Sequence, residues 1–363
     1  MQRRIVFFLL IFTSLFTRSY AQVSTVSRAA NAFLDTVQRH AYRSSLIKWD
    51  SIRPLFLEQT RTIADINGLE PYFKKILRQL KDKHSKLFFE KVENNKEAEQ
   101  ALFEKMAVMT DKEAGFPPKI FSHYMTKDQY AYIRIPGVFY EQRKFVDTVG
   151  AQLKVLDTKH PKAWIIDLTE NDGGSIFPMI WQFVSLLDVD ETYSLVDREG
   201  IEVRERARLK NLSGEELKMA QLFGLDPDKV PTISVRNKDI PIVLLVSELT
   251  SSAGEFFVAH FKGQKNVTVL GQTTSGQTSG NSQFPIGNNY MVNLTTDVLK
   301  DRSGKLYEIK EGIQPDVSFE IDFPSLLGVK KIETFDQLSQ AIRNANPIYM
   351  QHAISYLKQN LKK

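Results

Sequence analysis

The chain has 363 residues, of which 42% are hydrophobic, and a formal net charge of +5. Such a length can bury a sizeable core and is typical of a larger domain accompanied by a smaller one. The absence of cysteine excludes a disulfide framework, a thiol nucleophile and cysteine-ligated metal sites.

Residues 1–21 predict a signal peptide. A positively charged start precedes the mostly apolar residues 5–16, and Ser19-Tyr20-Ala21 ends in a small residue suited to cleavage. The apolar run is shorter than the ~20 residues that span a bilayer, although an uncleaved anchor is the alternative. Removing this segment removes three arginines and no acid, so the charge falls to +2 and gives no support for nucleic-acid binding. We expect an exported protein, periplasmic or extracellular, with no later membrane span.

Residues 22–107 predict a helical N-terminal domain. Apolar residues recur there at spacings of three and four, which is the period of an amphipathic helix. The clearest stripe contains Tyr72, Phe73, Ile76, Leu77 and Leu80. Residues 90–104 are heavily charged and predict an exposed helix or loop.

From residue 130 onward the pattern alternates between strands and helices. Repeated strand–helix–strand units with apolar strands indicate a largely parallel α/β sheet with both faces covered. We therefore assign residues 108–325 to an α/β core with a polar insertion at 190–238, and residues 326–363 to C-terminal helices. The expected strands are 130–136, 163–168, 241–246 and 266–270, and the expected helices are 145–158, 177–187, 215–222, one through His260, one ending near Asn344 and one starting at Ile348.

Ser252 is the candidate nucleophile. It lies between the strand at 241–246 and the helix that continues through His260, and small residues, Ala253 and Gly254, follow it. The start of a helix supplies unpaired backbone N–H groups and a positive dipole end, which favour developing negative charge. The alternative is an ordinary helix start, in which a hydroxyl residue is the N-cap and Glu255 completes a capping box.

Gly173 and Gly174 follow the strand at 163–168. Paired glycines let the backbone approach a ligand and direct N–H groups at it, as the oxyanion hole of a hydrolase requires. A tight turn without a catalytic role is the alternative. A phosphate-binding loop is weakly supported, because no Gly-Lys-Ser/Thr follows.

A serine nucleophile needs a base, and the chain has six histidines. His260 lies eight residues beyond Ser252, about 12 Å along the same helix, and cannot reach it. His84 lies at the end of the amphipathic stripe and is a candidate, although a surface histidine is the alternative. No paired-ligand spacing indicates a metal, and we expect no cofactor. Glu311 precedes a turn fixed by Gly312 and Pro315 and is either an imidazole-orienting carboxylate or a solvated loop acid.

Five segments between Tyr130 and Val317 form an ordered series over about 190 residues. They are Tyr132-Ile-Arg-Ile-Pro136, Ile165-Ile-Asp-Leu-x-x-Asn-x-Gly-Gly174, Thr250-Ser-Ser-Ala-Gly-Glu255, Leu270-Gly-x-x-Thr-x-Gly276 and Glu311-Gly-Ile-x-Pro-Asp-Val317. In these segments and their order the chain resembles the serine peptidases that include the C-terminal processing (tail-specific) proteases, the tricorn protease core and the interphotoreceptor retinoid-binding protein. The resemblance implies a crotonase/ClpP-like spiral core.

This family has two catalytic plans. The processing proteases use a Ser–Lys dyad with the lysine 25 residues after the serine, and here that position is Gln277, whose neutral amide cannot act as a base. The tricorn-like plan uses a histidine in an Asp-x-His-Ser segment and a glutamate before Gly-x-x-Pro-Asp. Asp82-Lys83-His84-Ser85 and Glu311 fit the second plan.

By resemblance, Ser252 is the nucleophile, His84 the general base and Glu311 the residue that orients the imidazole. The N–H of Ala253 and one from Gly173 or Gly174 would form the oxyanion hole, and Ser85 would support the machinery. The implied reaction is acyl transfer from a polypeptide to the serine, followed by hydrolysis.

Two features depart from the family pattern. Thr169 replaces an arginine that usually follows Asp-Leu, and the roughly 45 residues between His84 and Tyr130 are too few for a PDZ domain. Substrate selection is therefore expected from the catalytic cleft, the insertion or the helical domain. The alternative functions are a catalytically inactive protein that binds an apolar ligand or peptide on the same scaffold, and an esterase that uses the same residues.

Overall fold

The computed structural model describes residues 25–82, 84–89, 104–207, 212, 214–236, 238–286 and 290–361. The predicted signal peptide and most of the charged segment 90–104 lie outside these residues. The chain divides into two compact units, each described by itself below. The smaller contains Met1–Ala101, Asp197–Gly200 and Ser279–Asp297, and the larger contains Leu102–Val196, Ile201–Thr278 and Val298–Lys363.

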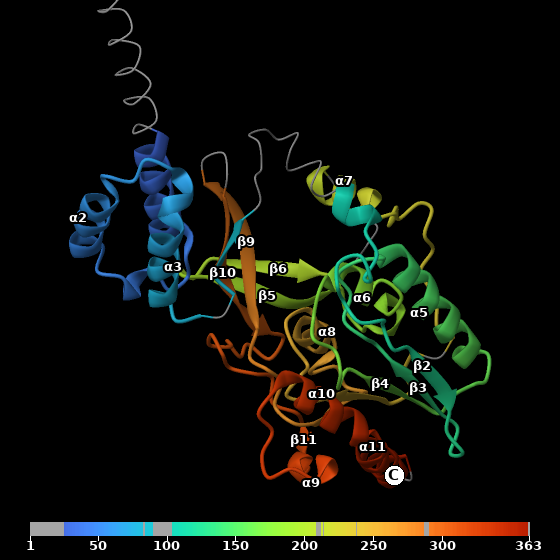
Figure 1. Cartoon of the computed structure of the whole chain (residues 1–363). Helices are drawn as coiled ribbons and strands as arrows, with labels where there is room; N and C mark the ends of the chain where they lie inside the picture. The colour runs from blue at the N-terminus through green and yellow to red at the C-terminus, as the bar shows by residue number, and fades with distance from the viewer. Residues whose placement is uncertain are drawn as a thin grey trace, which may run out of the picture. The chain divides into compact units, whose positions relative to one another are not determined.

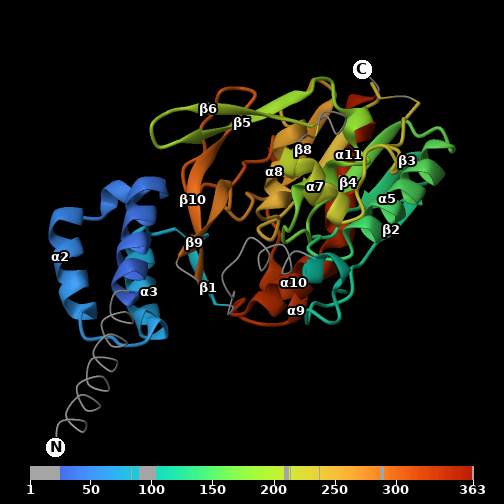
Figure 2. The ribbon, with the colours of Figure 1, turned by 90° about the horizontal axis from the view of Figure 1, so that it is seen from above.

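The smaller unit packs helices around an aromatic core. Phe33, Phe56 and Phe73 stack on one another, with 3.9 Å between the ring centroids of Phe33 and Phe73. The predicted stripe is confirmed for Phe73, Ile76, Leu77 and Leu80, which are all buried. The helices are residues 25–40, η1 (Ser44–Leu46), α2 (Trp49–Thr60), η2 (Ile66–Leu69) and α3 (Glu70–Gln79), and α2 and α3 lie side by side (Figure 1 and Figure 2).

Strands complete the smaller unit, although its N-terminal part was expected to be helical. β1 (Lys86–Phe89) pairs antiparallel with β10 (Tyr290–Asp301), in a register that places Lys86 opposite Asn293. β9 (Ser279–Ile286) also pairs with β10. The four residues of β1 are too few to show a strand period by themselves, and their partner lies some 200 residues later, which explains why the sequence pattern missed them.

A six-stranded sheet forms the centre of the larger unit, in the order β11-β8-β7-β4-β3-β2. All neighbouring pairs are parallel except β2 with β3. The α/β class and all four predicted core strands are confirmed. The strands are β2 (Ser122–Met125), β3 (Tyr130–Arg134), β4 (Ala163–Asp167), β7 (Ile242–Val246), β8 (Val267–Gly271) and β11 (Val317–Ser318).

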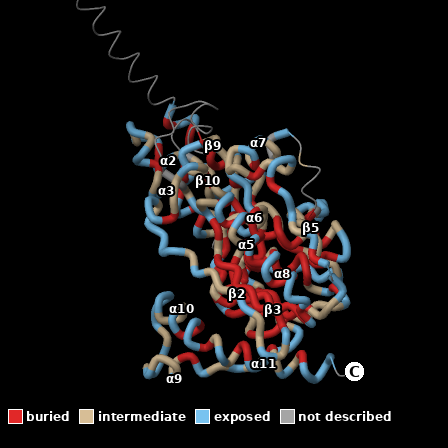
Figure 3. Tube along the Cα trace, turned by 90° about the vertical axis from the view of Figure 1, so that its right-hand side faces the viewer, coloured by how far each residue is buried: buried red, intermediate tan, exposed pale blue. Residues whose placement is uncertain are grey.

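Helices cover both faces of this sheet (Figure 1). In β4, Trp164 and Ile166 pack on one face, and Ala163 and Ile165 pack on the other. Because both faces are buried, the strands are continuous apolar runs. Figure 3 shows the buried residues of the larger unit concentrated along β3 and α8. The first face carries α5 (Gln142–Asp157), α6 (Ile176–Ile180) and α8 (Ala253–Phe261), and the second carries α9 (Phe323–Leu327), α10 (Phe335–Asn344) and α11 (Asn346–Asn360).

Two expectations about the elements need correction. The helix predicted at 177–187 is only the short α6, followed by a turn and η3 (Val184–Leu186), because the N–H groups of Phe183 and Leu186 bond three residues back instead of four. The insertion 190–238 contains α7 (Gly214–Leu222) near the predicted position. It also contains an antiparallel hairpin of β5 (Glu191–Asp197) and β6 (Glu202–Arg206), whose charged residues gave no strand signal. Across the described residues, no helix is both long and apolar enough to cross a membrane.

Candidate active site

Two loops meet at the carboxyl ends of the neighbouring strands β4 and β7. The Ser251 N–H donates to the carbonyl of Asn171 at 3.0 Å. The Thr250 hydroxyl donates to the carbonyl of Leu168 at 2.8 Å, and the Ser247 hydroxyl reaches the carbonyl of Thr169 at 2.5 Å. These bonds hold the turn that carries Ser252 against the loop that carries the paired glycines.

Ser252 has a strained backbone. Its φ of 49° and ψ of −117° lie where side-chain-bearing residues are rare, and α8 begins at the next residue. A serine on a sharp strand-to-helix turn is the arrangement that presents the nucleophilic hydroxyl in α/β-hydrolases. Its backbone N–H donates to Glu255 Oε2 at 3.0 Å. The capping interaction expected from Glu255 therefore uses the backbone of Ser252.

Gly173 and Gly174 adopt backbone angles that suit glycine, with φ values of 107° and 116°. A Cβ on Gly173 would lie 3.0 Å from the Cβ of Ser252 and 3.6 Å from the nitrogen of Ala253, so this backbone directly adjoins the serine turn. A Cβ on Gly174 would lie 2.1 Å from the carbonyl oxygen of Val138. Neither position has room for a side chain.

The structure distinguishes between the two glycine N–H groups. Gly173 donates its N–H to Oδ1 of Asn171 at 3.0 Å. Within the described part of the chain, the N–H groups of Gly174 and Ala253 have no protein acceptor. Each of the two loops thus keeps one unaccepted backbone donor, Ala253 directly after Ser252 and Gly174 directly after the glycine that adjoins Ser252.

Glu255 links the serine turn to the loop at 274–277. Its buried carboxylate accepts from the N–H of Ser252 at 3.0 Å, of Gly276 at 2.9 Å and of Gln277 at 2.7 Å, and from the Thr274 hydroxyl. Burial raises the pKa of Glu255, while these hydrogen bonds oppose that shift. Because backbone N–H groups can only donate, both carboxylate oxygens act as acceptors.

Gln277 lies beside the candidate nucleophile. Its side-chain nitrogen Nε2 donates to the hydroxyl of Ser251 at 2.6 Å. This is the position at which a dyad lysine was sought in the sequence. Here it carries an amide that hydrogen-bonds the neighbour of Ser252.

Glu311 lies in a turn that is tied to the same loop. The Thr278 hydroxyl donates to the Glu311 carbonyl at 2.9 Å, and the Ile313 N–H donates to the Thr274 hydroxyl at 2.7 Å. The Glu311 carboxylate pairs with Lys305 at 2.8 Å and accepts from the Glu308 N–H. The contact with Lys305 is the main reason that the pKa of Glu311 is lowered.

His84 and Ser85 belong to the smaller unit. Nδ1 of His84 is 2.7 Å from the hydroxyl of Ser279, the first residue of β9. Ser85 donates its N–H and its hydroxyl to Asp82, at 2.6 Å and 2.9 Å. The His84 segment is therefore fixed by its own Asp-x-His-Ser turn and by a strand from the second half of the chain. The larger unit brings together Ser252, Ala253 and the two glycines and ties the Glu311 turn to them, and the smaller unit holds His84 and Ser85.

Comparison with known proteins gives the family. The profile described as peptidase family S41 matches residues 129–319, more than half of the chain. The chain belongs to peptidase family S41. This is a family of serine-type peptidases, and its matched region contains Ser252, both glycines, Glu255 and Glu311.

Relatives of this S41 chain share parts of its length. It is 28% identical over 157 residues to the nisin-resistance protein of Lactococcus lactis, covering 42% of this chain and 45% of that protein. It is 24% identical over 206 residues to a carboxy-terminal-processing protease of Bartonella bacilliformis, covering 55% of this chain and 41% of that protein. The matches thus span less than half the length of both relatives.

Solved structures share the S41 fold. A lipoprotein from Streptococcus agalactiae has a TM-score of 0.61 and 23% identity, covering 84% of this chain and 95% of that one. The photosystem II D1 C-terminal processing protease has a TM-score of 0.56 and 14% identity, covering 87% and 97%. These similarities confirm the crotonase/ClpP-like spiral core expected for the S41 chain.

Asn171 is a site residue that the sequence pattern did not assign a role. It is fully buried, and its side chain donates to the Ile135 carbonyl at 3.0 Å while accepting from Gly173. Its carbonyl accepts from Ser251. An asparagine two residues before a glycine pair, directly after a buried strand, is the signal that could have identified it, because asparagine side chains hydrogen-bond their own backbone two residues on.

Thr169 occupies the position where the S41 pattern usually has arginine, and it is well accommodated. Its N–H and hydroxyl donate to Asp167 Oδ1 at 2.9 Å and 2.6 Å. The other oxygen of Asp167 accepts from Arg134 of β3 at 3.0 Å. A guanidinium from the neighbouring strand therefore balances the buried acid. Among the described residues, no cluster of three histidine, aspartate or glutamate side chains has the arrangement of a metal site.

Proposed function

We propose that this protein is an exported serine endopeptidase that hydrolyses polypeptides through an acyl-enzyme on Ser252. The strained turn of Ser252, with the unaccepted N–H group of Ala253 directly after it and that of Gly174 in the adjoining glycine loop, carries the proposal. A hydroxyl with unaccepted backbone donors on the loops around it is suited to form a tetrahedral intermediate and stabilise its oxyanion. Family membership supports polypeptide as the substrate class.

The oxyanion hole consists, in this proposal, of the N–H groups of Ala253 and Gly174. The sequence alone does not distinguish Gly173 from Gly174 as the second donor. The N–H of Gly173 already donates to the side chain of Asn171, so it stabilises the loop and is not available to an oxyanion. Its contribution is steric, because only a hydrogen atom fits between this backbone and Ser252.

His84 is the proposed general base and Glu311 the proposed orienting carboxylate, with Ser85 supporting the histidine. The amide at Gln277 supports this choice over a lysine base, since an amide accepts no proton at neutral pH. The hydrogen bond between His84 Nδ1 and Ser279 supports a fixed position for the ring. His84 removes the proton of the Ser252 hydroxyl during attack and returns it to the leaving amine, and a water molecule then hydrolyses the acyl-enzyme.

Export is part of this proposal and rests on the charged, apolar and small-residue pattern of residues 1–21. No observation favours a non-catalytic binding protein. Thr169, the departure that had suggested lost catalysis, retains its full set of hydrogen bonds with Asp167.

The test is covalent labelling with a fluorophosphonate, together with cleavage of an unstructured polypeptide. The wild-type protein is expected to be labelled on Ser252 and to cleave, and Ser252→Ala is expected to do neither while keeping its melting temperature. Ser251→Ala is the matched control, because it removes the adjacent hydroxyl and should keep the label. Turnover that persists in Ser252→Ala would refute the proposal. Saturable binding of an apolar ligand without any turnover would favour the binding-protein alternative, and turnover of esters but not peptides would favour the esterase.

A further inference from the structure

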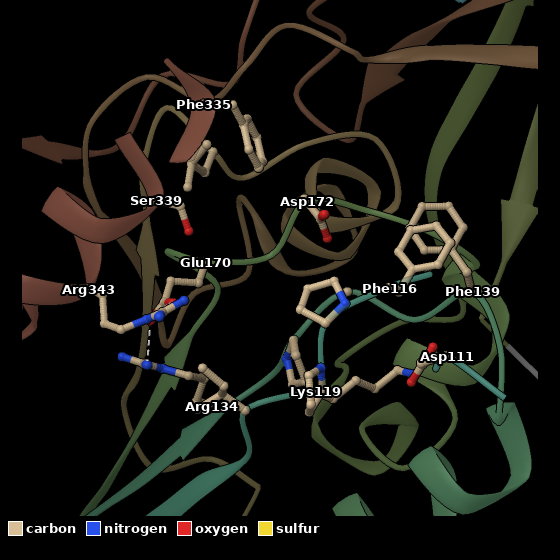
Figure 4. A pocket seen from close by; sticks show the side chains of 16 residues that line it. Asp111, Phe116, Lys119, Arg134, Phe139, Glu170, Asp172, Phe335, Ser339 and Arg343 are labelled. Atoms are coloured by element: carbon tan, nitrogen blue, oxygen red, sulfur yellow. Dashed lines mark hydrogen bonds and ion pairs between the residues drawn. The ribbon is translucent and has the colours of Figure 1, made fainter. Parts of the chain in front are cut away.

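A cavity of about 150 Å³ in the larger unit lies next to the loop of the paired glycines (Figure 4). Its walls come from residues 116–120, from the residues after β3, β4 and β7, and from α10. Asp172, which lines it, directly precedes Gly173, whose backbone adjoins Ser252. A cavity of this size accommodates a group about as large as a benzene ring, so it suits one side chain.

The rim of this cavity is aromatic. Phe116 and Phe139 stack with 5.3 Å between their ring centroids, and each is about 40% exposed. Phe335 at the start of α10 is 60% exposed. Exposed rings around a cavity are suited to cover the aliphatic stem of a long side chain and to attract a cation by its contact with their faces.

Most charges in the cavity neutralise one another. Arg134 binds Asp167 and Glu170, and Arg343 binds the second oxygen of Glu170 at 2.8 Å. Two guanidinium groups are thus balanced by two carboxylates. Lys119 and Asp111 form a further ion pair.

Asp172 is the exception. Among the described residues, no cation or side-chain donor contacts its carboxylate. Figure 4 shows the Asp172 side chain apart from both ion-paired groups and directed toward the middle of the lining residues. Asp172 is exposed as a residue, but partial burial of its carboxyl group raises its pKa, so a bound cation would stabilise its negative charge.

We propose that this cavity, the Asp172 pocket, binds a lysine or arginine side chain of the polypeptide substrate close to the bond that Ser252 cleaves, with Asp172 as the counter-ion. The inference rests on the proposed peptidase activity. The aromatic rim holds the aliphatic stem, and the carboxylate receives the charged head through charge-assisted hydrogen bonds.

The test uses internally quenched peptides that differ at a single position near the cleaved bond, which carries lysine, norleucine or glutamate. For wild-type protein, we expect kcat/KM for the best-placed lysine peptide to exceed that of the norleucine peptide by roughly ten- to a hundredfold. Asp172→Asn should bring this ratio close to one, Asp172→Glu should retain a preference for lysine, and Asp172→Lys should favour glutamate. Asp336→Asn is the matched control, since it removes an exposed charge of α10 outside the pocket and should keep the wild-type ratio.

Binding to inactive protein separates the two proposals. Ser252→Ala is expected to bind a fluorescent lysine peptide about tenfold more tightly than its acetyl-lysine analogue, and adding Asp172→Asn should abolish the difference. Peptide cleavage with no lysine preference, with a glutamate preference, or with the same ratio in Asp172→Asn overturns the pocket assignment and leaves the peptidase intact. Charge-dependent binding without any turnover supports the pocket and refutes the peptidase. If neither cleavage nor binding depends on this charge, the pocket assignment is wrong.

Discussion

The backbone N–H of Ser252 donates a 3.0 Å hydrogen bond to the buried carboxylate of Glu255, three residues later. The same carboxylate receives the N–H groups of Gly276 and Gln277. One side chain therefore fixes both the strained turn and the loop beside it.

Glu255→Gln should weaken both the fold and the activity. It replaces one acceptor oxygen by an NH2 group that faces N–H donors, so at least one buried donor loses its partner. We expect the free energy of unfolding to fall by roughly 2–4 kcal/mol, measured by urea denaturation, together with a clear drop in kcat. Glu248→Gln changes an exposed carboxylate of the same turn and should alter stability by no more than about 0.5 kcal/mol. Equal effects in the two variants would show that the Glu255 network does not hold the turn.

Substitutions at His84 and Gln277 separate the two catalytic plans. If the imidazole is the base, His84→Ala should lower kcat/KM by roughly 10³-fold or more. Gln277→Ala removes the hydrogen bond to the Ser251 hydroxyl and leaves the imidazole in place, so its activity should stay within about tenfold of wild type. Steady-state kinetics on one peptide substrate measures both. An inactive Gln277→Ala beside a near-normal His84→Ala would reverse the assignment.

Gly173→Ala tests the close approach of the two loops. The added methyl group would lie 3.0 Å from the Cβ of Ser252 at a φ of 107°, so it should displace the backbone that we propose binds the oxyanion. We expect kcat to fall roughly a hundredfold or more. Gly328→Ala is the control, because that glycine also has a positive φ of 65° but has open space around its Cα. It should cost about 1–2 kcal/mol of stability without changing kcat.

His260 predicts how stability depends on pH. Its complete burial, with a smaller contribution from Arg302, lowers its pKa from 6.5 to about 3. Below pH 6.5, His260 is protonated in the unfolded chain but stays neutral in the folded one. The contribution of its neutral form to stability is therefore present above pH 6.5 and is lost as the pH falls toward 3. The slope should be about 1.4 kcal/mol per pH unit.

Urea denaturation between pH 7 and pH 4 measures the slope of the free energy of unfolding against pH. His260→Gln should flatten the slope even if it lowers stability at every pH, since the Nδ1 contact with Thr192 is lost. His123→Gln, at an exposed position on β2, should keep the wild-type slope. An unchanged slope in His260→Gln would assign the acid sensitivity to other groups.

The core strands could be predicted because strands buried on both faces consist almost entirely of apolar residues. Residues 163–168 and 241–246 are unbroken apolar runs, since helices cover both faces of the sheet. The hairpin at β5 and β6 could not be found in this way, because Glu202 and Arg204 give no apolar period. The prediction of one helix at 177–187 was wrong because apolar spacing does not reveal where backbone N–H groups bond the carbonyl three residues back instead of four.

The candidate site was predictable only in part. Ser252 and the glycine pair follow buried strands, and parallel neighbours place such loops together. What the pattern could not supply is which N–H groups remain available, because that depends on the Asn171 side chain bonding Gly173. The sequence also could not identify Asp172 as a carboxylate without a cationic partner. That depends on the fold, in which Arg134 and Arg343 pair with other acids.

The strand after His84 has a consequence for biosynthesis. Lys86 and its neighbours pair with residues around Asn293, and Ser279 bonds the imidazole itself. The ribosome must therefore add some 200 further residues before β1 can pair with β10 and His84 can bond Ser279. A chain truncated before β9 should lack both contacts with the His84 segment, even if its helices form.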